Sequence, residues 1–193
     1  MSYPATPSFA TVNLSSQNKT LISEAISGKI QARQISGHKW TFTASYPPMT
    51  RAEFAPVLAF IMQQRGMLNT FDVYIPIVND SLSSATGTLR ANGAHSAGDT
   101  TITVDGITGR LEVGDLIRFS GHTKVYMVVA ESYLSGNTIG VTIEPPLVED
   151  VVDDDSILYN NVPMRVRLAN DVQEFSLRTD SLVAYEVDFI EVI

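Results

Sequence analysis

The chain has 193 residues, enough for one sizeable domain or two small ones, because a chain of this length buries about 70% of its unfolded surface. It contains no cysteine, which excludes a disulfide framework, a thiolate metal site and a cysteine nucleophile. Its formal net charge is −8, so the sequence lacks the excess of basic residues that is typical of a nucleic-acid-binding protein. No apolar run approaches the roughly 18 residues that span a bilayer, and the first residues lack a secretory signal. We therefore expect a soluble protein made in the cytoplasm, with no membrane partner.

The first strongly patterned segment, residues 38–46, predicts a β-strand. Apolar and polar residues alternate along it, and a period of two gives a strand one face for a core and one for water. The apolar positions are Trp40, Phe42, Ala44 and Tyr46.

Residues 50–65 predict a helix. Thr50 and Glu53 form a T-x-x-E capping box, and Gly66 stands where a helix-ending glycine belongs. Apolar residues recur at helical spacing and predict the side that covers a sheet. They are Phe54, Val57, Leu58, Ile61 and Met62.

The opposite side of the same helix carries small, uncharged residues. A solvated helix face normally carries charges, so this composition favours close approach by another surface. The candidates for a contact with a neighbouring subunit are Ala52, Ala55, Ala59 and the bordering Phe60.

Residues 71–77 predict a further strand, placed at an edge or bulged at Pro76, which cannot donate a ladder hydrogen bond. The stretch 83–159 then predicts a module of its own. It begins with a polar run rich in glycine and alanine, ends near an acidic run, and contains several short strand-like segments between. Such a set fits a small closed β-barrel, since closure removes exposed strand edges.

Residues 164–168 and 183–189 alternate in the same way as the first strand. The prediction is a mainly β fold with one packed helix and a discontinuous main domain. That domain comprises residues 1–82 and 160–193, with the module 83–159 inserted, because long insertions between strands cost little loop entropy.

Motifs for catalysis are missing from the sequence. His38, His95 and His122 stand apart in turn-like or polar segments, where surface positions are expected and metal-ligand spacing is absent. There is no G-x-S-x-G elbow, no phosphate-binding loop and no dinucleotide-binding motif. We expect no catalysis, no cofactor and no metal.

The acidic run 149–155 leaves two interpretations open. A charged loop or subunit contact is the default for such a run, and a weak cation site is the alternative. The pattern of an EF-hand is missing, which favours the loop.

Two patterns resemble bacteriophage tail proteins of the distal tail or tail-tube type. The first is the order of a strand opening at Gly37–Trp40, the helix 50–65 and an extended FDVYIP segment. The second lies in the module, where Gly98–Val104 reads G-D-T-T-I-T-V and Leu111–Asp115 reads L-E-V-G-D. Similar runs recur in tail and baseplate proteins that carry a small β-barrel.

The resemblance implies a tail-tube-like β-sandwich or barrel with an inserted small barrel. It implies a structural ring subunit of the virion, commonly hexameric, assembled in the host cytoplasm and joining the tail tube to the hub or host-binding parts. Its partners would be further copies of itself and the tube, hub, fibre or tip proteins. DNA would only pass through the lumen, and the net negative charge fits such a conduit, since a basic lining would trap phosphates.

Two other classes of function stay open. One is a carbohydrate- or receptor-binding β module of a virion with its ligand on the inserted barrel, which an exposed aromatic platform would favour. Its candidates are Phe119, Tyr126, Tyr133 and Tyr159. The other is a hydrolase of unrecognised type, for which no motif argues.

Overall fold

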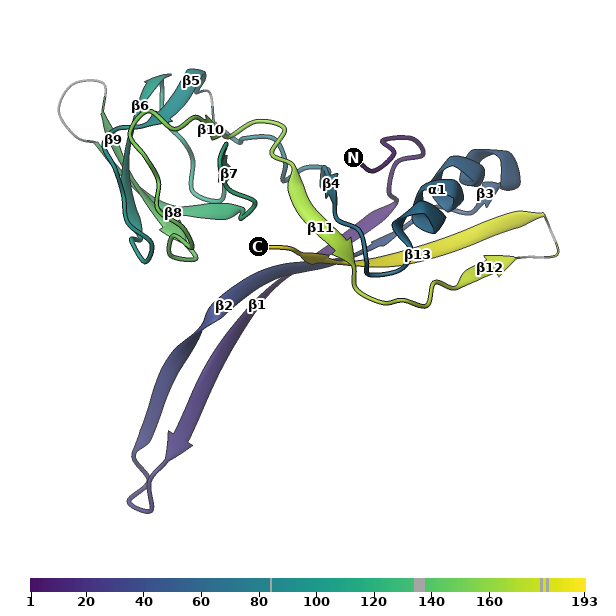
Figure 1. Cartoon of the computed structure of the whole chain (residues 1–193), viewed down its shortest axis with the longest axis horizontal. Helices are drawn as coiled ribbons and strands as arrows, with labels where there is room; N and C mark the ends of the chain where they lie inside the picture. Colours follow the sequence, from purple (N-terminus) through teal and green to yellow (C-terminus); the bar gives the residue numbers. More distant parts are fainter. Residues whose placement is uncertain (84, 134–137, 178, 180) are drawn as a thin grey trace. The chain divides into compact units, whose positions relative to one another are not determined.

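The computed structural model describes residues 1–83, 85–133, 138–177, 179 and 181–193, with backbone alone at Ser36 and 131–133 (Figure 1). Strands make up 48% of the chain and helix 8%, which confirms the predicted mainly β fold with a packed helix. The chain divides into two compact units. The first comprises Met1–Ala5, Phe71–Val166 and Val192–Ile193; the second comprises Thr6–Thr70 and Arg167–Glu191.

The second unit is built on an antiparallel sheet. Strand β2 (Ile30–Ser45) lies between β1 (Thr11–Glu24) and β13 (Leu182–Glu191). The first half of β13 also pairs with two short strands, β3 (Met49–Thr50) and β12 (Phe175–Leu177). The predicted strand at 38–46 is therefore the end of a much longer hairpin.

Most of the β1–β2 hairpin extends beyond its sheet. Strand β13 pairs with β2 over Thr41–Ser45 only, so residues 17–39 form a two-stranded ribbon, which we call the arm. Every side chain described between residues 17 and 37 is exposed. A register shift between Gln17 and Lys19 marks a bulge where the arm begins. Figure 1 shows the arm leaving the rest of its sheet.

Helix α1 (Arg51–Gln64) follows the sequence signals closely. The Thr50 hydroxyl accepts from the Glu53 backbone N–H, and the Glu53 carboxylate accepts from the Thr50 N–H at 2.8 Å, so the capping box forms. Arg65 ends the helix in the left-handed conformation and is followed by Gly66, also at positive φ. The first turn is thus specified locally by two residues.

The helix and the sheet enclose an aromatic core. On β13, every second side chain is buried, from Val183 to Phe189, as the alternation predicts. Phe42 of β2 lies against Phe189 with ring centroids 4.7 Å apart, and Phe54 of α1 meets Tyr185 edge-on at 5.4 Å. Packing between aromatic rings of this geometry anchors the helix on the sheet.

The first unit contains the barrel. Six strands pair in the order β10-β7-β8-β9-β6-β5, and a bridge between Arg90 and Ser156 links the two ends of that order. The nearly closed six-stranded barrel confirms the predicted small barrel. The strands are β5 (Thr86–Ala91), β6 (Thr101–Thr108), β7 (Leu116–Phe119), β8 (Tyr126–Tyr133), β9 (Ile139–Glu144) and β10 (Ile157–Leu158).

The L-E-V-G-D motif builds a turn around a buried carboxylate. Asp115 is 1% exposed and accepts from the backbone N–H groups of Leu82 at 2.7 Å and Glu112 at 2.9 Å. It also accepts from the Ser81 hydroxyl at 2.6 Å. Gly114 precedes it at a φ of +102°. One side chain therefore fixes the turn into β7 and ties it to the segment leading into the barrel.

The first unit also contains β4 (Phe71–Val73), which pairs with β11 (Met164–Leu168) through residues 164–166. Asp72 on β4 meets Arg165 at 3.2 Å and Arg118 of the barrel at 3.8 Å. The strand is shorter than the predicted 71–77. It ends before Pro76, and Ile77 is exposed at a φ of +76°.

Candidate assembly surfaces

The predicted interface residues on α1 divide between two environments. Ala52, Ala55 and Ala59 are exposed, as a contact with another molecule requires. Phe60 departs from the expectation, since it is 8% exposed and lies on the covered side of the helix. The buried side runs through Phe54, Val57, Phe60, Ile61 and Gln64, whereas Met62 is exposed. The helix is thus rotated from the predicted stripe.

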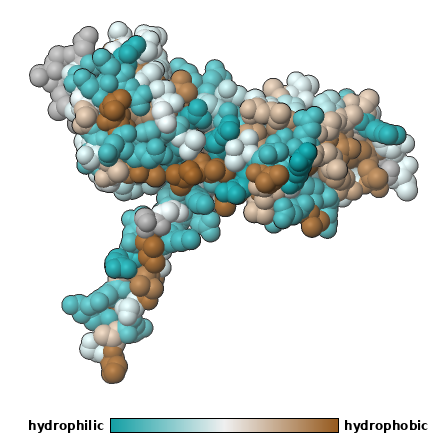
Figure 2. Space-filling model, viewed as in Figure 1, coloured by the Kyte–Doolittle hydropathy of each residue, from teal (hydrophilic) through white to brown (hydrophobic). Residues whose placement is uncertain are grey.

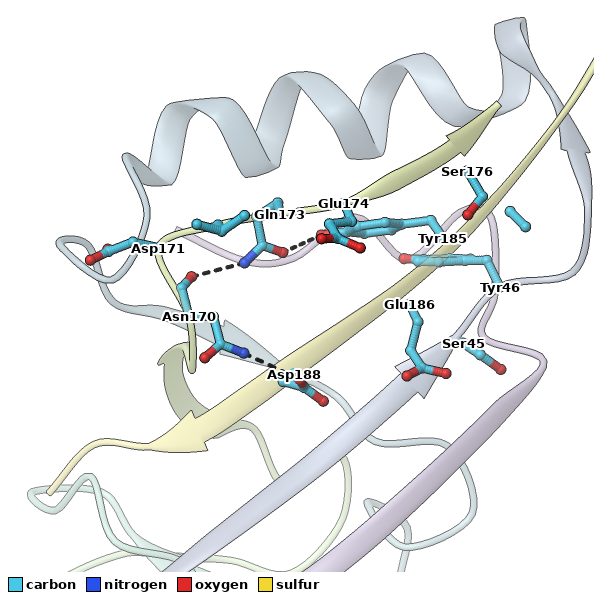
Figure 3. Close-up of a pocket in the computed structure, with 12 residues that line it drawn as sticks. Ser45, Tyr46, Asn170, Asp171, Gln173, Glu174, Ser176, Tyr185, Glu186 and Asp188 are labelled. Atoms are coloured by element: carbon cyan, nitrogen blue, oxygen red, sulfur yellow. Dashed lines mark hydrogen bonds between the residues drawn. The ribbon is translucent and has the colours of Figure 1, made fainter. Parts of the chain in front are cut away.

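A groove of about 660 Å³ lies in the second unit, beside the end of β2 (Figure 3). One wall is β13 from Ala184 to Asp188, and the other is the segment 170–176, which leads into β12. Ser45 and Tyr46 complete the lining. No sequence pattern predicts this groove, because Ser45 and Tyr46 precede the two walls by more than a hundred residues in the sequence.

A chain of hydrogen bonds holds the two walls in place. The Tyr185 hydroxyl donates to Gln173 Oε1 at 2.7 Å, and Gln173 Nε2 donates to the Asn170 carbonyl at 2.8 Å (Figure 3). Asn170 Nδ2 donates to Asp188 Oδ2 at 3.3 Å. Burial, and then the neighbouring Tyr46 and Asp188, raise the pKa of Tyr185 above its ordinary value. The hydroxyl therefore stays a donor at neutral pH.

The groove is acidic. It contains the carboxylates of Asp171, Glu174, Glu186 and Asp188, and the described residues that line it include no lysine, arginine or histidine. Asp171 and Asp188 accept hydrogen bonds from the chain. Glu174 and Glu186 are exposed, and no described residue gives either side chain a hydrogen bond or an ion pair. Such a surface favours cationic side chains.

In the barrel, the acidic run 149–155 uses its carboxylates separately. Asp150 accepts from the Ala97 N–H at 2.8 Å, and Asp153 from the Gly93 N–H at 2.7 Å. Asp155 accepts from the Ser120 hydroxyl at 2.6 Å. Within the described residues no group of three or more His, Cys, Asp or Glu side chains is placed to hold a metal ion. The run thus connects neighbouring loops of the barrel.

The three histidines lie in different places and serve local structure. The expectation of surface positions is wrong for His38 and His122, which are 8% and 7% exposed. His38 pairs with the Ser16 hydroxyl at 2.9 Å and packs edge-on against Trp40. His95 Nε2 accepts from the Thr103 N–H at 3.1 Å. Each is engaged with its own neighbours, so the structure does not bring them together.

The candidate aromatic platform on the barrel is mostly internal. Phe119, Tyr126 and Tyr159 are all buried, so none offers a face for stacking a sugar. The side chain of Tyr133 lies outside the described part of the structure.

Within the described residues, no helix is long and apolar enough to cross a membrane.

Fold and surfaces together define a mainly β protein that joins a small barrel to a second sheet with a long exposed arm and an acidic groove. Residues 84–162 match the family described as Distal tail protein pb9, B domain. The chain is also 27% identical over 167 residues to Distal tail protein pb9 of Escherichia phage T5, covering 84% of this chain and 80% of that protein. These findings confirm the predicted resemblance to phage tail proteins of the distal tail type.

Proposed function

We propose that the chain is a structural ring subunit of a phage tail, a distal tail-like adaptor that joins the tail tube to the hub or host-binding parts. The observation that carries the proposal is the similarity to a phage distal tail protein along 84% of the chain, in both units and not in the barrel alone. The proposed partners are other copies of the chain, arranged as a ring of six, and the neighbouring tube, hub, fibre or tip proteins.

Features of the chain support a role in assembly rather than catalysis. Several exposed surfaces are available for contact with other molecules: Ala52, Ala55 and Ala59 on α1, the arm, and the acidic groove. The buried Asp115 and the half-buried Asp72 use their carboxylates to hold a turn and a strand junction. The net charge of −8 suits a lumen through which DNA passes without binding.

Electron microscopy of the purified protein tests the ring directly. The expected result is a closed ring with a central hole, and rotational averaging gives the copy number. Labelling of intact virions with an antibody against the chain should then place it at the far end of the tail tube. A protein that stays monomeric at high concentration, or a label elsewhere on the particle, would contradict the proposal.

Absence of catalysis is tested on the same preparation. Assays with peptidoglycan, ester and nucleotide substrates should show no turnover. A reproducible hydrolysis that disappears when one carboxylate is substituted would make the chain an enzyme and refute this part of the proposal.

A further inference from the structure

Among the described residues, no further strand pairs with the arm, residues 17–39. The part of β2 that precedes Thr41 pairs with β1 alone, and β1 is an edge strand of the sheet. A two-stranded ribbon on its own is marginally stable in water, and open strand edges favour pairing or burial against another chain. The arm therefore presents an interaction surface on both faces and both edges.

The strand register assigns the side chains of the arm to two faces, because directly paired residues of an antiparallel ladder point to the same side. The first face interleaves the cations Lys19 and Arg33 with the apolar Leu21 and Ile35, and ends at the polar pair Ser23 and Gln31. The second face carries as many polar as apolar residues: Thr20, Glu24 and Gln34 beside Ile22, Ile30 and Ala32. Figure 2 shows brown, apolar side chains along the arm among teal, polar ones.

The charge of the arm is opposite to that of the remaining chain. The arm carries four basic residues and one acidic residue, a formal charge of +3, which leaves −11 on the other residues of a chain whose total is −8. Lys19 and Arg33 are exposed, and no described residue forms an ion pair with either. The free cations of the arm thus match the free carboxylates of the groove, Glu174 and Glu186.

The two complementary surfaces lie at opposite ends of the same strand. Arg33 precedes Ser45, at the rim of the groove, by twelve residues of β2, a span of about 40 Å at about 3.3 Å per strand residue. An extended strand cannot bring its own end back over that distance. The arm of one copy can therefore meet this groove only on a second copy.

We propose that the arm of one subunit docks with its basic face on the acidic groove of the next copy. This inference rests on the ring proposed above and names the contact that closes it. The contact joins two different patches, so it is head-to-tail, and contacts of that kind generate rings when the rotation between copies closes. Lys19 and Arg33 pair with Glu174 and Glu186, while Leu21 and Ile35 are removed from water.

Charge reversal on each side separately tests the contact. The arm variant is Lys19→Glu with Arg33→Glu, and the groove variant is Glu174→Lys with Glu186→Lys. Each variant alone should weaken self-association by at least about a hundredfold in sedimentation velocity, because like charges then face each other. All four positions are exposed, so circular dichroism melts should match the unaltered chain. Association of the unaltered chain should also weaken with added salt.

Mixing the two variants is the decisive step. The acidic arm of the first variant fits the basic groove of the second, and the basic arm of the second fits the acidic groove of the first. An equimolar mixture should therefore form rings that neither variant forms alone. A control with Arg90→Glu and Arg110→Glu, both at exposed positions of the barrel, makes the same change in net charge as the arm variant and should assemble normally.

The outcomes separate the contact from the ring. If the unaltered chain forms rings and both reversed variants also form them with unchanged affinity, the contact is wrong while the ring stands. If each variant fails to assemble and the mixture fails as well, then the failure does not come from a broken contact between the arm and the groove, and the inference is again refuted. If the unaltered chain never assembles, both the ring and the contact fall.

Discussion

Replacing Asp115 with alanine should destabilise the first unit more than the loss of an exposed carboxylate of the barrel. The Asp115 side chain is almost completely buried and accepts three hydrogen bonds, from Ser81, Leu82 and Glu112. Two of these donors are backbone N–H groups at the entry to the barrel. Removing the carboxylate leaves them without their acceptor in a part-buried turn.

The size of the effect follows from those three bonds. A hydrogen bond to a charged acceptor contributes about 1.5 kcal/mol at the low end of its range, so three contribute about 4.5 kcal/mol. Removing the buried charge also removes its desolvation cost, so the free energy of unfolding should fall by about 3 kcal/mol in Asp115→Ala. Asp115→Asn keeps one acceptor oxygen and should lose about 1.5 kcal/mol.

Urea unfolding followed by circular dichroism measures the loss, with Asp99→Ala as the matched control. Asp99 also sits after a glycine in a turn, but it is exposed and its side chain accepts from the Ser96 N–H. The control should lose about 1 kcal/mol. Hydrogen exchange at the Leu82 and Glu112 amides should accelerate in the Asp115 variant alone. Equal losses in Asp115→Ala and Asp99→Ala would refute the reasoning that the buried carboxylate organises the turn.

Four further predictions concern the remaining surfaces and titrating groups. Ala59→Glu should leave the melting curve unchanged but prevent assembly in light scattering, whereas Val57→Glu, at a fully buried position, should unfold the chain. Hydrogen bonds from the backbone and then the side chain of Thr50 lower the pKa of Glu53, so its support of α1 is complete at neutral pH. That support is lost as the pH falls through the lowered pKa, below the ordinary 4.5, which amide exchange in the first helical turn will report. Because the pKa of Tyr185 is raised, its contribution to the free energy of unfolding is complete below the ordinary tyrosine pKa of 10.0 and is lost as the pH rises further. The Tyr185→Phe variant should therefore lose less stability at alkaline pH, which Trp40 fluorescence can follow. Replacing residues 84–159 with a short Gly-Ser linker should leave a chain that retains the near-ultraviolet signal of the aromatic core, and an unfolded product would contradict the proposed insertion.

Elements specified by neighbouring residues are predictable from the sequence. The local signals predict a helix at 50–65 and the helix spans Arg51–Gln64, because a capping box at one end and Gly66 at the other act within single turns. The barrel is predictable for a similar reason, since its turns are marked by local glycines and acidic residues. The side of the helix that faces the sheet is harder to predict. Phe60 and Met62 are both large and apolar, and only the packing of the core decides between them.

The arm and the groove cannot be predicted by the same reasoning. Alternation of apolar and polar residues arises when one face of a strand is buried, and the arm is exposed on both faces. Residues 17–37 therefore show no period of two, although they pair as an antiparallel ladder. The groove forms only where Ser45, the segment 170–176 and β13 lie side by side in the folded chain, and no local sequence pattern predicts that arrangement.

The bulge between Gln17 and Lys19 has a consequence for an isolated copy of the chain. At high concentration, flat ribbons with open edges can pair edge to edge into insoluble aggregates. A bulge strengthens the local twist and interrupts the ladder, and Lys19 adds a charge at that point. Together they discourage two identical ribbons from pairing along their full length. In the proposed contact, the arm can thus offer its open edges to a second copy without pairing with an identical arm along its whole length.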